Sequence, residues 1–192
     1  MSEKRQDLID TAIELFAEHG FHATGIDRIA EVAGVSKKTL YHHFRSKEEL
    51  ILAALKHHDG LFRNFLMKSV DQLSDSPYER LLGIFDVAQA WFSGKDFYGC
   101  MFINAIGEYS HGDTAIRRAC QDFKTQVSAY VEQLAVSAQI DNPKALADSL
   151  SILLEGAIVT AQVAGNAESA GTAKRAAKVL IDSALDHNVE TV

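Results

Sequence analysis

The sequence predicts an all-α protein, and three observations carry that prediction. Apolar residues recur at helical spacing along almost the whole chain, and no segment alternates as a strand would. Only two prolines occur among the 192 residues, and each follows a residue that can cap a helix. Ser76-Pro77 is followed by Glu79, and Asn142 precedes Pro143, so both prolines fit the first helical position.

The composition is that of an average soluble globular protein. Apolar residues make up 47% of the chain, charged residues 23%, and the formal net charge is −7. Cys100 and Cys120 are too few for a disulfide scaffold, and the apolar content excludes a wholly disordered chain. Apolar runs are short and the N-terminus lacks an apolar segment. We therefore expect no signal peptide, no membrane-spanning helix, no membrane partner and a cytoplasmic location with reduced cysteines.

Each helix can be placed by its apolar spacing and its boundary residues. Thr24, Ser36 and Ser46 are suited to cap helices, and Gly20 and Gly34 are suited to end them. The expected helices span residues 6–19, 25–33, 36–44, 46–73, 77–92, 99–109, 113–139, 143–164 and 172–187. No linker rich in proline, glycine or serine separates the first 50 residues from the rest, so any coupling between the two parts should run through the fourth helix.

The third predicted helix has two different faces. At 100° per residue, Leu40 and Phe44 lie together on one side, whereas Lys38, His42 and Arg45 point to the other. A helix that enters a DNA major groove needs such hydrogen-bond donors opposite an apolar anchor. The alternative is an ordinary solvated basic face.

The residues around this helix resemble a known family. Residues 20–50, GFHATGIDRIAEVAGVSKKTLYHHFRSKEEL, closely resemble the DNA-binding domain of the TetR family of repressors. The resemblance implies a three-helix helix-turn-helix domain over 1–47, followed over 48–192 by a larger helical ligand-binding and dimerisation domain. It also implies a homodimer on a near-palindromic double-stranded DNA operator, released by a small-molecule effector.

The resemblance assigns DNA-binding roles residue by residue. Thr24 matches the cap of the second helix, Lys47 a backbone-contacting lysine, and Tyr41 a phosphate-contacting tyrosine. Gly25 departs from the hydroxyl residue usual in the family, which removes one phosphate contact. The complete predicted DNA-binding set is Thr24, Arg28, Lys37, Lys38, Thr39, Tyr41, His42, His43 and Lys47.

Aromatic residues gather around the sixth predicted helix, which suggests a ligand pocket with a few polar groups. The predicted ligand-binding residues are Trp91, Cys100, Phe102, Asn104 and Glu108. A plain hydrophobic core is the alternative interpretation. Cys100 at a helix start also allows an electrophile- or redox-sensing regulator with Cys120 as partner, although a small buried side chain is favoured.

The helix predicted over 143–164 is apolar on two sides. Ile152, Gly156, Val159 and Val163 form a second stripe beside the one that would pack on its own domain. With the final helix, this stripe predicts a four-helix dimer interface. A central helix within a monomer is the alternative.

Other classes of function find little support in the sequence. An enzyme would need catalytic residues, yet Gly34-Val35-Ser36 lacks the second glycine of a nucleophile elbow and follows a helix. No phosphate-binding loop or other cofactor motif occurs, and adjacent His57-His58-Asp59 fit a solvated face better than a metal site. A helical interaction module that binds no DNA remains the third class.

Overall fold

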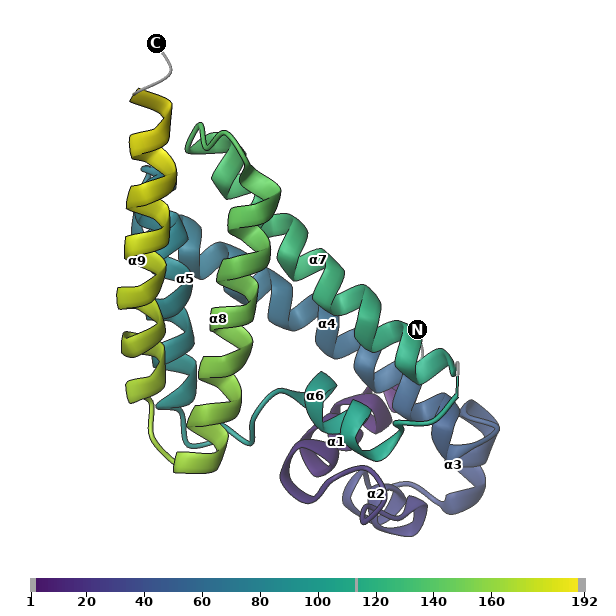
Figure 1. The fold of residues 1–192 in the computed structure, drawn as a ribbon. Coiled ribbons are helices and arrows are strands. Elements are labelled where there is room, and N and C mark those ends of the chain that lie inside the picture. Colours follow the sequence, from purple (N-terminus) through teal and green to yellow (C-terminus); the bar gives the residue numbers. More distant parts are fainter. Residues whose placement is uncertain (1–2, 113, 190–192) are drawn as a thin grey trace. The chain divides into compact units, whose positions relative to one another are not determined.

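The computed structural model describes residues 3–112 and 114–189, and these ranges are helical without any strand (Figure 1). The all-α prediction is therefore confirmed. The helices are α1 (Glu3–His19), α2 (Ile26–Val32), α3 (Lys37–His43), α4 (Lys47–Leu73), α5 (Pro77–Phe92), α6 (Met101–Glu108), α7 (Ala115–Ser137), α8 (Pro143–Ala164) and α9 (Glu168–Val189).

Two of the predicted helix starts are wrong for local reasons. Gly99 adopts a left-handed backbone conformation (φ 84°), so α6 begins two residues later than the expected start. Residue 113, the expected start of α7, lies outside the described residues. The last helix begins four residues earlier than expected, because the Asn166 side chain accepts a hydrogen bond from the Glu168 N–H and Ala170 is fully buried.

The chain divides into two compact units, Met1–Phe62 with Cys100–Phe123 and Arg63–Gly99 with Lys124–Val192. We call them the head unit and the bundle unit. They do not follow the expected boundary between residues 47 and 48. α4 is continuous across the boundary at Phe62, and α6 with the start of α7 belongs to the head unit.

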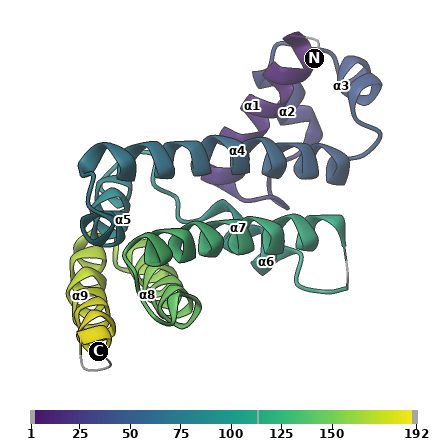
Figure 2. The same cartoon turned by 90° about the horizontal axis from the view of Figure 1, so that it is seen from above.

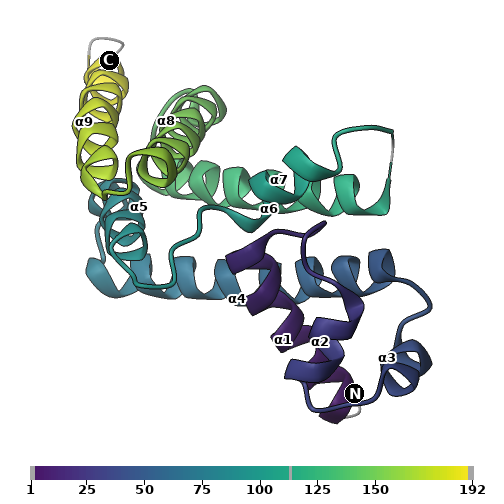
Figure 3. The same cartoon turned by 90° about the horizontal axis from the view of Figure 1, so that it is seen from below.

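The head unit packs α1, α2 and α3 beside the N-terminal half of α4 (Figure 3). Its core includes the fully buried Leu8 and Phe16 of α1, Ile29 of α2 and Leu55 of α4. Phe102 of α6 stacks on Phe123 of α7, with ring centroids 3.7 Å apart. Burying these large side chains supplies the main stabilisation of the unit.

The His57-His58-Asp59 segment does not form the solvated face that we expected. The His57 ring contacts the Gln6 side chain at 2.9 Å. The His58 ring lies 5.8 Å from the Phe102 ring, and burial lowers the pKa of His58. No cluster of three or more metal-ligating side chains occurs among the described residues.

The bundle unit is built on α5, α8 and α9, which lie side by side (Figures 1 and 2). Its buried side chains are large on α5, as at Leu81 and Phe85, and small on α9, as at Ala170, Ala173 and Ala177. α8 is long and apolar enough, by length and composition, to cross a membrane. This corrects the expectation that no segment would be long and apolar enough to span a membrane. In this structure α8 packs against α5 and α9.

We predict that Tyr130 makes folding stability sensitive to alkaline pH. Its hydroxyl is buried without a hydrogen-bond partner in the described structure, and burial raises the pKa of Tyr130 to about 12. The unfolded chain therefore loses this proton at lower pH than the folded chain, so stability should fall as pH rises from about 10 towards 12.

Tyr130→Phe should remove that part of the pH dependence and raise stability at pH 7 by about 1 kcal/mol, because no unpaired hydroxyl remains buried. Urea unfolding of both proteins at pH 7, 9 and 11 measures this. Equal slopes with pH in the two proteins would contradict it.

Candidate DNA-binding surface

α2 and α3 are joined by a tight turn that the backbone itself stabilises. Gly34 has φ 66°, a left-handed conformation that glycine adopts without steric cost. The Val35 N–H donates to the Ala30 carbonyl at 3.0 Å, and the Gly34 N–H donates to the Glu31 carbonyl at 3.1 Å. These bonds satisfy two carbonyls in the last turn of α2, and the connection to α3 takes only the four residues from Ala33 to Ser36.

α3 is fixed at its start and along its inner face. The Ser36 hydroxyl accepts a hydrogen bond from the Thr39 N–H at 3.0 Å, which confirms Ser36 as the cap. Leu40 and Phe44 are both fully buried, so the predicted apolar anchor is confirmed. The rotation of α3 about its axis is set by these two side chains.

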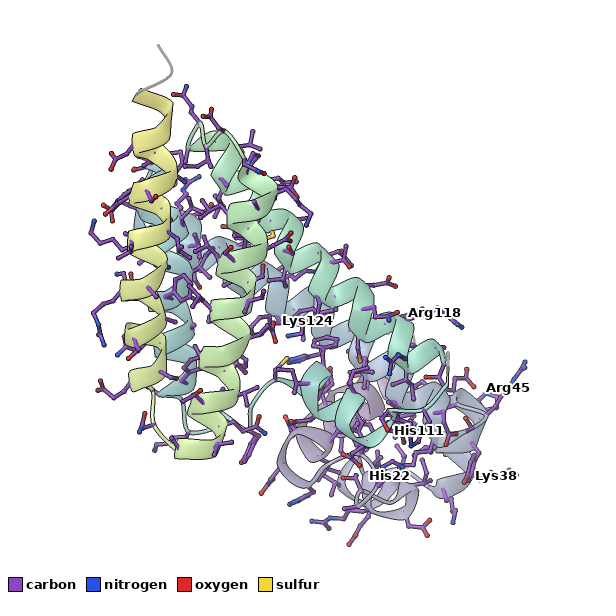
Figure 4. The ribbon with its side chains drawn as sticks, in the orientation of Figure 1. His22, Lys38, Arg45, His111, Arg118 and Lys124 are labelled. Atoms are coloured by element: carbon purple, nitrogen blue, oxygen red, sulfur yellow. The ribbon has the colours of Figure 1, made fainter. Side chains whose placement is uncertain are left out.

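The opposite face of α3 carries exposed donors. Lys38 of α3 and Arg45, two residues beyond the end of α3, point away from the helices of the head unit (Figure 4), and neither side chain forms an ion pair with a described residue. Tyr41 is also exposed, and the rings of His42 and His43 lie edge to face, 5.3 Å apart. This arrangement offers cations, a phenol and imidazoles on one surface, as contacts with phosphates and base edges require.

Two of the predicted DNA-binding cations are paired with acidic residues instead. Lys37 Nζ lies 2.7 Å from Asp27 of α2, and this hydrogen bond raises the pKa of Lys37. Arg28 lies 3.1 Å from Glu31. Both pairs are exposed, so they contribute little stability and can exchange partners readily. The Lys37–Asp27 pair joins α3 to α2, and the Arg28–Glu31 pair lies on α2. Both pairs lower the positive charge near α3.

Thr24 does not have the role that the sequence predicted. Gly25 is the N-cap of α2 and makes no side-chain cap bond. Thr24 is buried, and its hydroxyl donates to the Gly20 carbonyl at 2.7 Å and lies 3.2 Å from the Leu15 carbonyl. The hydroxyl therefore stabilises the α1–α2 connection in the interior of the head unit and does not cap a helix at the surface.

Two further residues complete the surface. The Lys47 ammonium donates to the His22 carbonyl at 3.3 Å, so it is partly occupied within the head unit. Arg5, which sequence reasoning missed, lies over the Phe44 ring at 4.8 Å. It brings the N-terminal end of α1 next to the end of α3. Only the tertiary fold reveals that proximity.

The predicted ligand-binding residues belong to both units. Trp91 belongs to the bundle unit, where its ring lies 5.1 Å from the Phe97 ring. Cys100 and Phe102 are buried in the head unit, and Asn104 is half-buried on the same helix. The carboxylate of Glu108 is occupied by hydrogen bonds from Phe21 and His22, and its role in ligand binding stays a prediction.

The bundle unit contains two grooves that the sequence did not indicate. One, of about 530 Å³, lies between α7 and α8 and is lined by charged and apolar side chains, including Lys124, Glu155 and Leu154. The other, of about 490 Å³, lies between α8 and α9 and is lined mostly by small residues, such as Gly156 and Ala173. Neither groove includes any of the five predicted ligand-binding residues.

We predict that Asp27→Asn strengthens DNA binding. The substitution releases the Lys37 ammonium and removes one negative charge beside α3. Because an exposed ion pair is worth at most about 1 kcal/mol, the expected gain in affinity is up to about fivefold at 0.1 M salt. Fluorescence anisotropy on duplex DNA measures it. Glu14→Gln, an equal charge change at an exposed site on α1, is the control, and equal affinities for the two variants would contradict the prediction.

Comparison with known proteins gives matches over both parts of the chain. Residues 8–54 match the family of bacterial regulatory proteins called the tetR family. Residues 77–177, more than half of the chain, match the C-terminal domain described as tetracyclin repressor-like. The two matches are consecutive and follow the order of a DNA-binding domain and a second helical domain.

Individual relatives agree with this assignment. The transcriptional activator FasR of Mycolicibacterium smegmatis is 54% identical over 56 residues, which are 29% of this chain and 26% of FasR. The transcriptional repressor KstR2 of Mycobacterium tuberculosis is 37% identical over 91 residues, covering 44% of this chain and 42% of KstR2. The similarity thus spans less than half the length of these curated relatives.

A solved structure extends the similarity to nearly the whole chain. A TetR-family transcriptional regulator from Streptomyces coelicolor superposes with a TM-score of 0.87 and 27% identity, covering 95% of this chain and 90% of that one. The helix-turn-helix geometry, the second helical unit and these matches agree. The chain belongs to the TetR family of bacterial regulatory proteins.

Proposed function

We propose that this protein is a transcriptional regulator that binds a near-palindromic DNA operator as a homodimer. The observation that carries the proposal is the outward face of α3. Lys38 is exposed there, and Arg45 is exposed two residues beyond the end of α3, both without ion pairs to described residues, while Leu40 and Phe44 are buried on the opposite side. Each subunit would place this face in a major groove, and the twofold axis would set the spacing of the half-sites.

Homodimerisation is supported by apolar side chains that the bundle unit leaves exposed. Ile152 and Val163 of α8 are 72% and 83% exposed, and Val179 of α9 is 67% exposed. The α8–α9 groove beside them is lined by small residues, so a second copy's helices could approach closely. An exposed apolar stripe of this kind on two adjacent helices is typical of a protein–protein interface.

We further propose that the protein acts in the cytoplasm as a repressor, and that a small molecule releases it from DNA. The repressor role is supported by the name of KstR2, whereas FasR is named an activator. An effector must bind one arrangement of the dimer better than the other in order to change operator affinity. The five predicted residues, Trp91, Cys100, Phe102, Asn104 and Glu108, stay candidates for its site, and catalysis forms no part of the proposal.

Lys38→Ala tests the DNA-binding proposal. If Lys38 reads a base, the change should weaken operator binding by about 1–3 kcal/mol while leaving binding to scrambled DNA nearly unchanged. The measurement is anisotropy on DNA from upstream of the protein's own gene and on a scrambled duplex, across a salt series.

Lys95→Ala removes an exposed lysine of the bundle unit and is the matched control. An equal loss on both duplexes would make Lys38 a phosphate contact only. If the unsubstituted protein bound neither duplex at low salt, the proposal would fail.

The dimer interface is tested by placing charges on the exposed stripe. Ile152→Glu combined with Val163→Glu should convert the dimer to a monomer at micromolar concentration, because buried carboxylates would face each other across the interface. Sedimentation velocity measures the state. Val136→Glu, at an exposed apolar residue of α7, is the control. A double variant that stays dimeric would place the interface elsewhere.

A further inference from the structure

The connection between α1 and α2, residues 20–25, is held by a carboxylate that lies far away in the sequence. Glu108 Oε1 accepts a hydrogen bond from the Phe21 N–H at 2.7 Å. Glu108 Oε2 accepts from the His22 N–H at 2.6 Å and contacts His22 Nδ1 at 2.7 Å. Since a carboxylate only accepts, Nδ1 carries the hydrogen in this contact. One side chain of α6 thus takes three donors from two adjacent residues.

The electrostatics of Glu108 agree with this geometry. Burial alone would raise the pKa of its carboxyl, but the hydrogen bonds from Phe21 and His22 outweigh burial and hold that pKa below its ordinary value. The charged form is therefore the form that the loop stabilises. Charge-assisted bonds of this kind are about twice as strong as neutral ones.

Ring packing fixes the same connection to the helices. The Tyr109 ring stacks on the His22 ring, with centroids 4.8 Å apart, and Phe21 stacks on Phe16 of α1 at 4.9 Å. Gly20 has φ 85°, and a Cβ at this position would lie 3.0 Å from Glu108 Oε1. The backbone approaches the carboxylate so closely that a larger residue would displace it.

The connection leads directly into α2, whose N-cap makes no side-chain hydrogen bond, although Asp27 in its first turn is paired with Lys37. Its N-cap, Gly25, has no side chain to accept a hydrogen bond. The remaining restraints on the connection are the Thr24 hydroxyl on the inside and the Lys47 ammonium on the His22 carbonyl. A seven-residue helix such as α2 depends on such tertiary contacts for its position.

We propose that Glu108 is a positioning residue for DNA binding, which fixes residues 20–25 and, through them, the start of α2 and Arg28. This inference rests on the proposed DNA-binding function. It makes α6 a part of the DNA-binding head, although α6 lies outside residues 8–54. It also gives α6 a direct connection to the helix-turn-helix in addition to α4, so any displacement of α6 withdraws the carboxylate from the loop.

The test compares Glu108→Gln with Glu14→Gln in the full-length protein. Both changes remove one negative charge from the head unit, so their effects on non-specific DNA attraction should match. Hydrogen exchange at the Phe21 and His22 amides reports the local contact, with the α9 amides as an internal reference. Anisotropy on operator and scrambled duplexes reports the function.

In Glu108→Gln, the Phe21 and His22 amides should exchange about tenfold faster than in Glu14→Gln, because the charge-assisted bonds are lost. Operator affinity should fall about three- to tenfold, with affinity for scrambled DNA unchanged. If Glu108→Gln does not fold, Glu108→Asp keeps the charge but is too short to reach both amides, and it should show the same pattern.

Three outcomes would overturn the inference. In the first, both variants have the same operator affinity, so the contact does not position the DNA-binding helices. In the second, all amides of Glu108→Gln exchange faster by the same factor, so the residue acts on global stability alone. In the third, the unsubstituted protein prefers no sequence, so the DNA-binding proposal itself fails and this inference fails with it.

Discussion

The burial of Leu40 and Phe44 is the constraint on which the candidate DNA-binding surface depends. α3 has seven residues, and a helix this short is unstable in water without tertiary contacts. The burial of these two side chains fixes which side of α3 faces solvent. Lys38 and Arg45 are therefore exposed as a consequence of apolar packing, and Arg5 lies against the outer side of that packing, over the Phe44 ring.

The helices were predictable because their signals are local. The prolines at 77 and 143 follow capping residues, and the structure shows Ser76 and Asn142 accepting hydrogen bonds from the backbone three residues later. Gly34 follows α2 in a left-handed backbone conformation, which a glycine at this position predicts. In each case the helix boundary is determined by a few neighbouring residues.

The contacts that the sequence did not predict depend on how the helices pack against one another. Glu108 looked like a polar group in a ligand pocket, but its partners lie 86 and 87 positions earlier. Thr24 looked like a surface cap, but burial turns its hydroxyl inward to Gly20. His58 looked solvated, but it lies beside Phe102, which is on another helix. Helical periodicity does not contain this information, because it describes each helix separately.

The head unit is assembled from two stretches of chain with residues 63–99 of the bundle unit between them. During synthesis, α1 to α4 are complete before Glu108 and Phe102 exist, so their loop amides and apolar surfaces have no partner at that stage. Non-local contacts of this kind form late and leave apolar surface exposed meanwhile. The Phe21 and His22 amides therefore gain their Glu108 partner only after more than half of the chain has been synthesised.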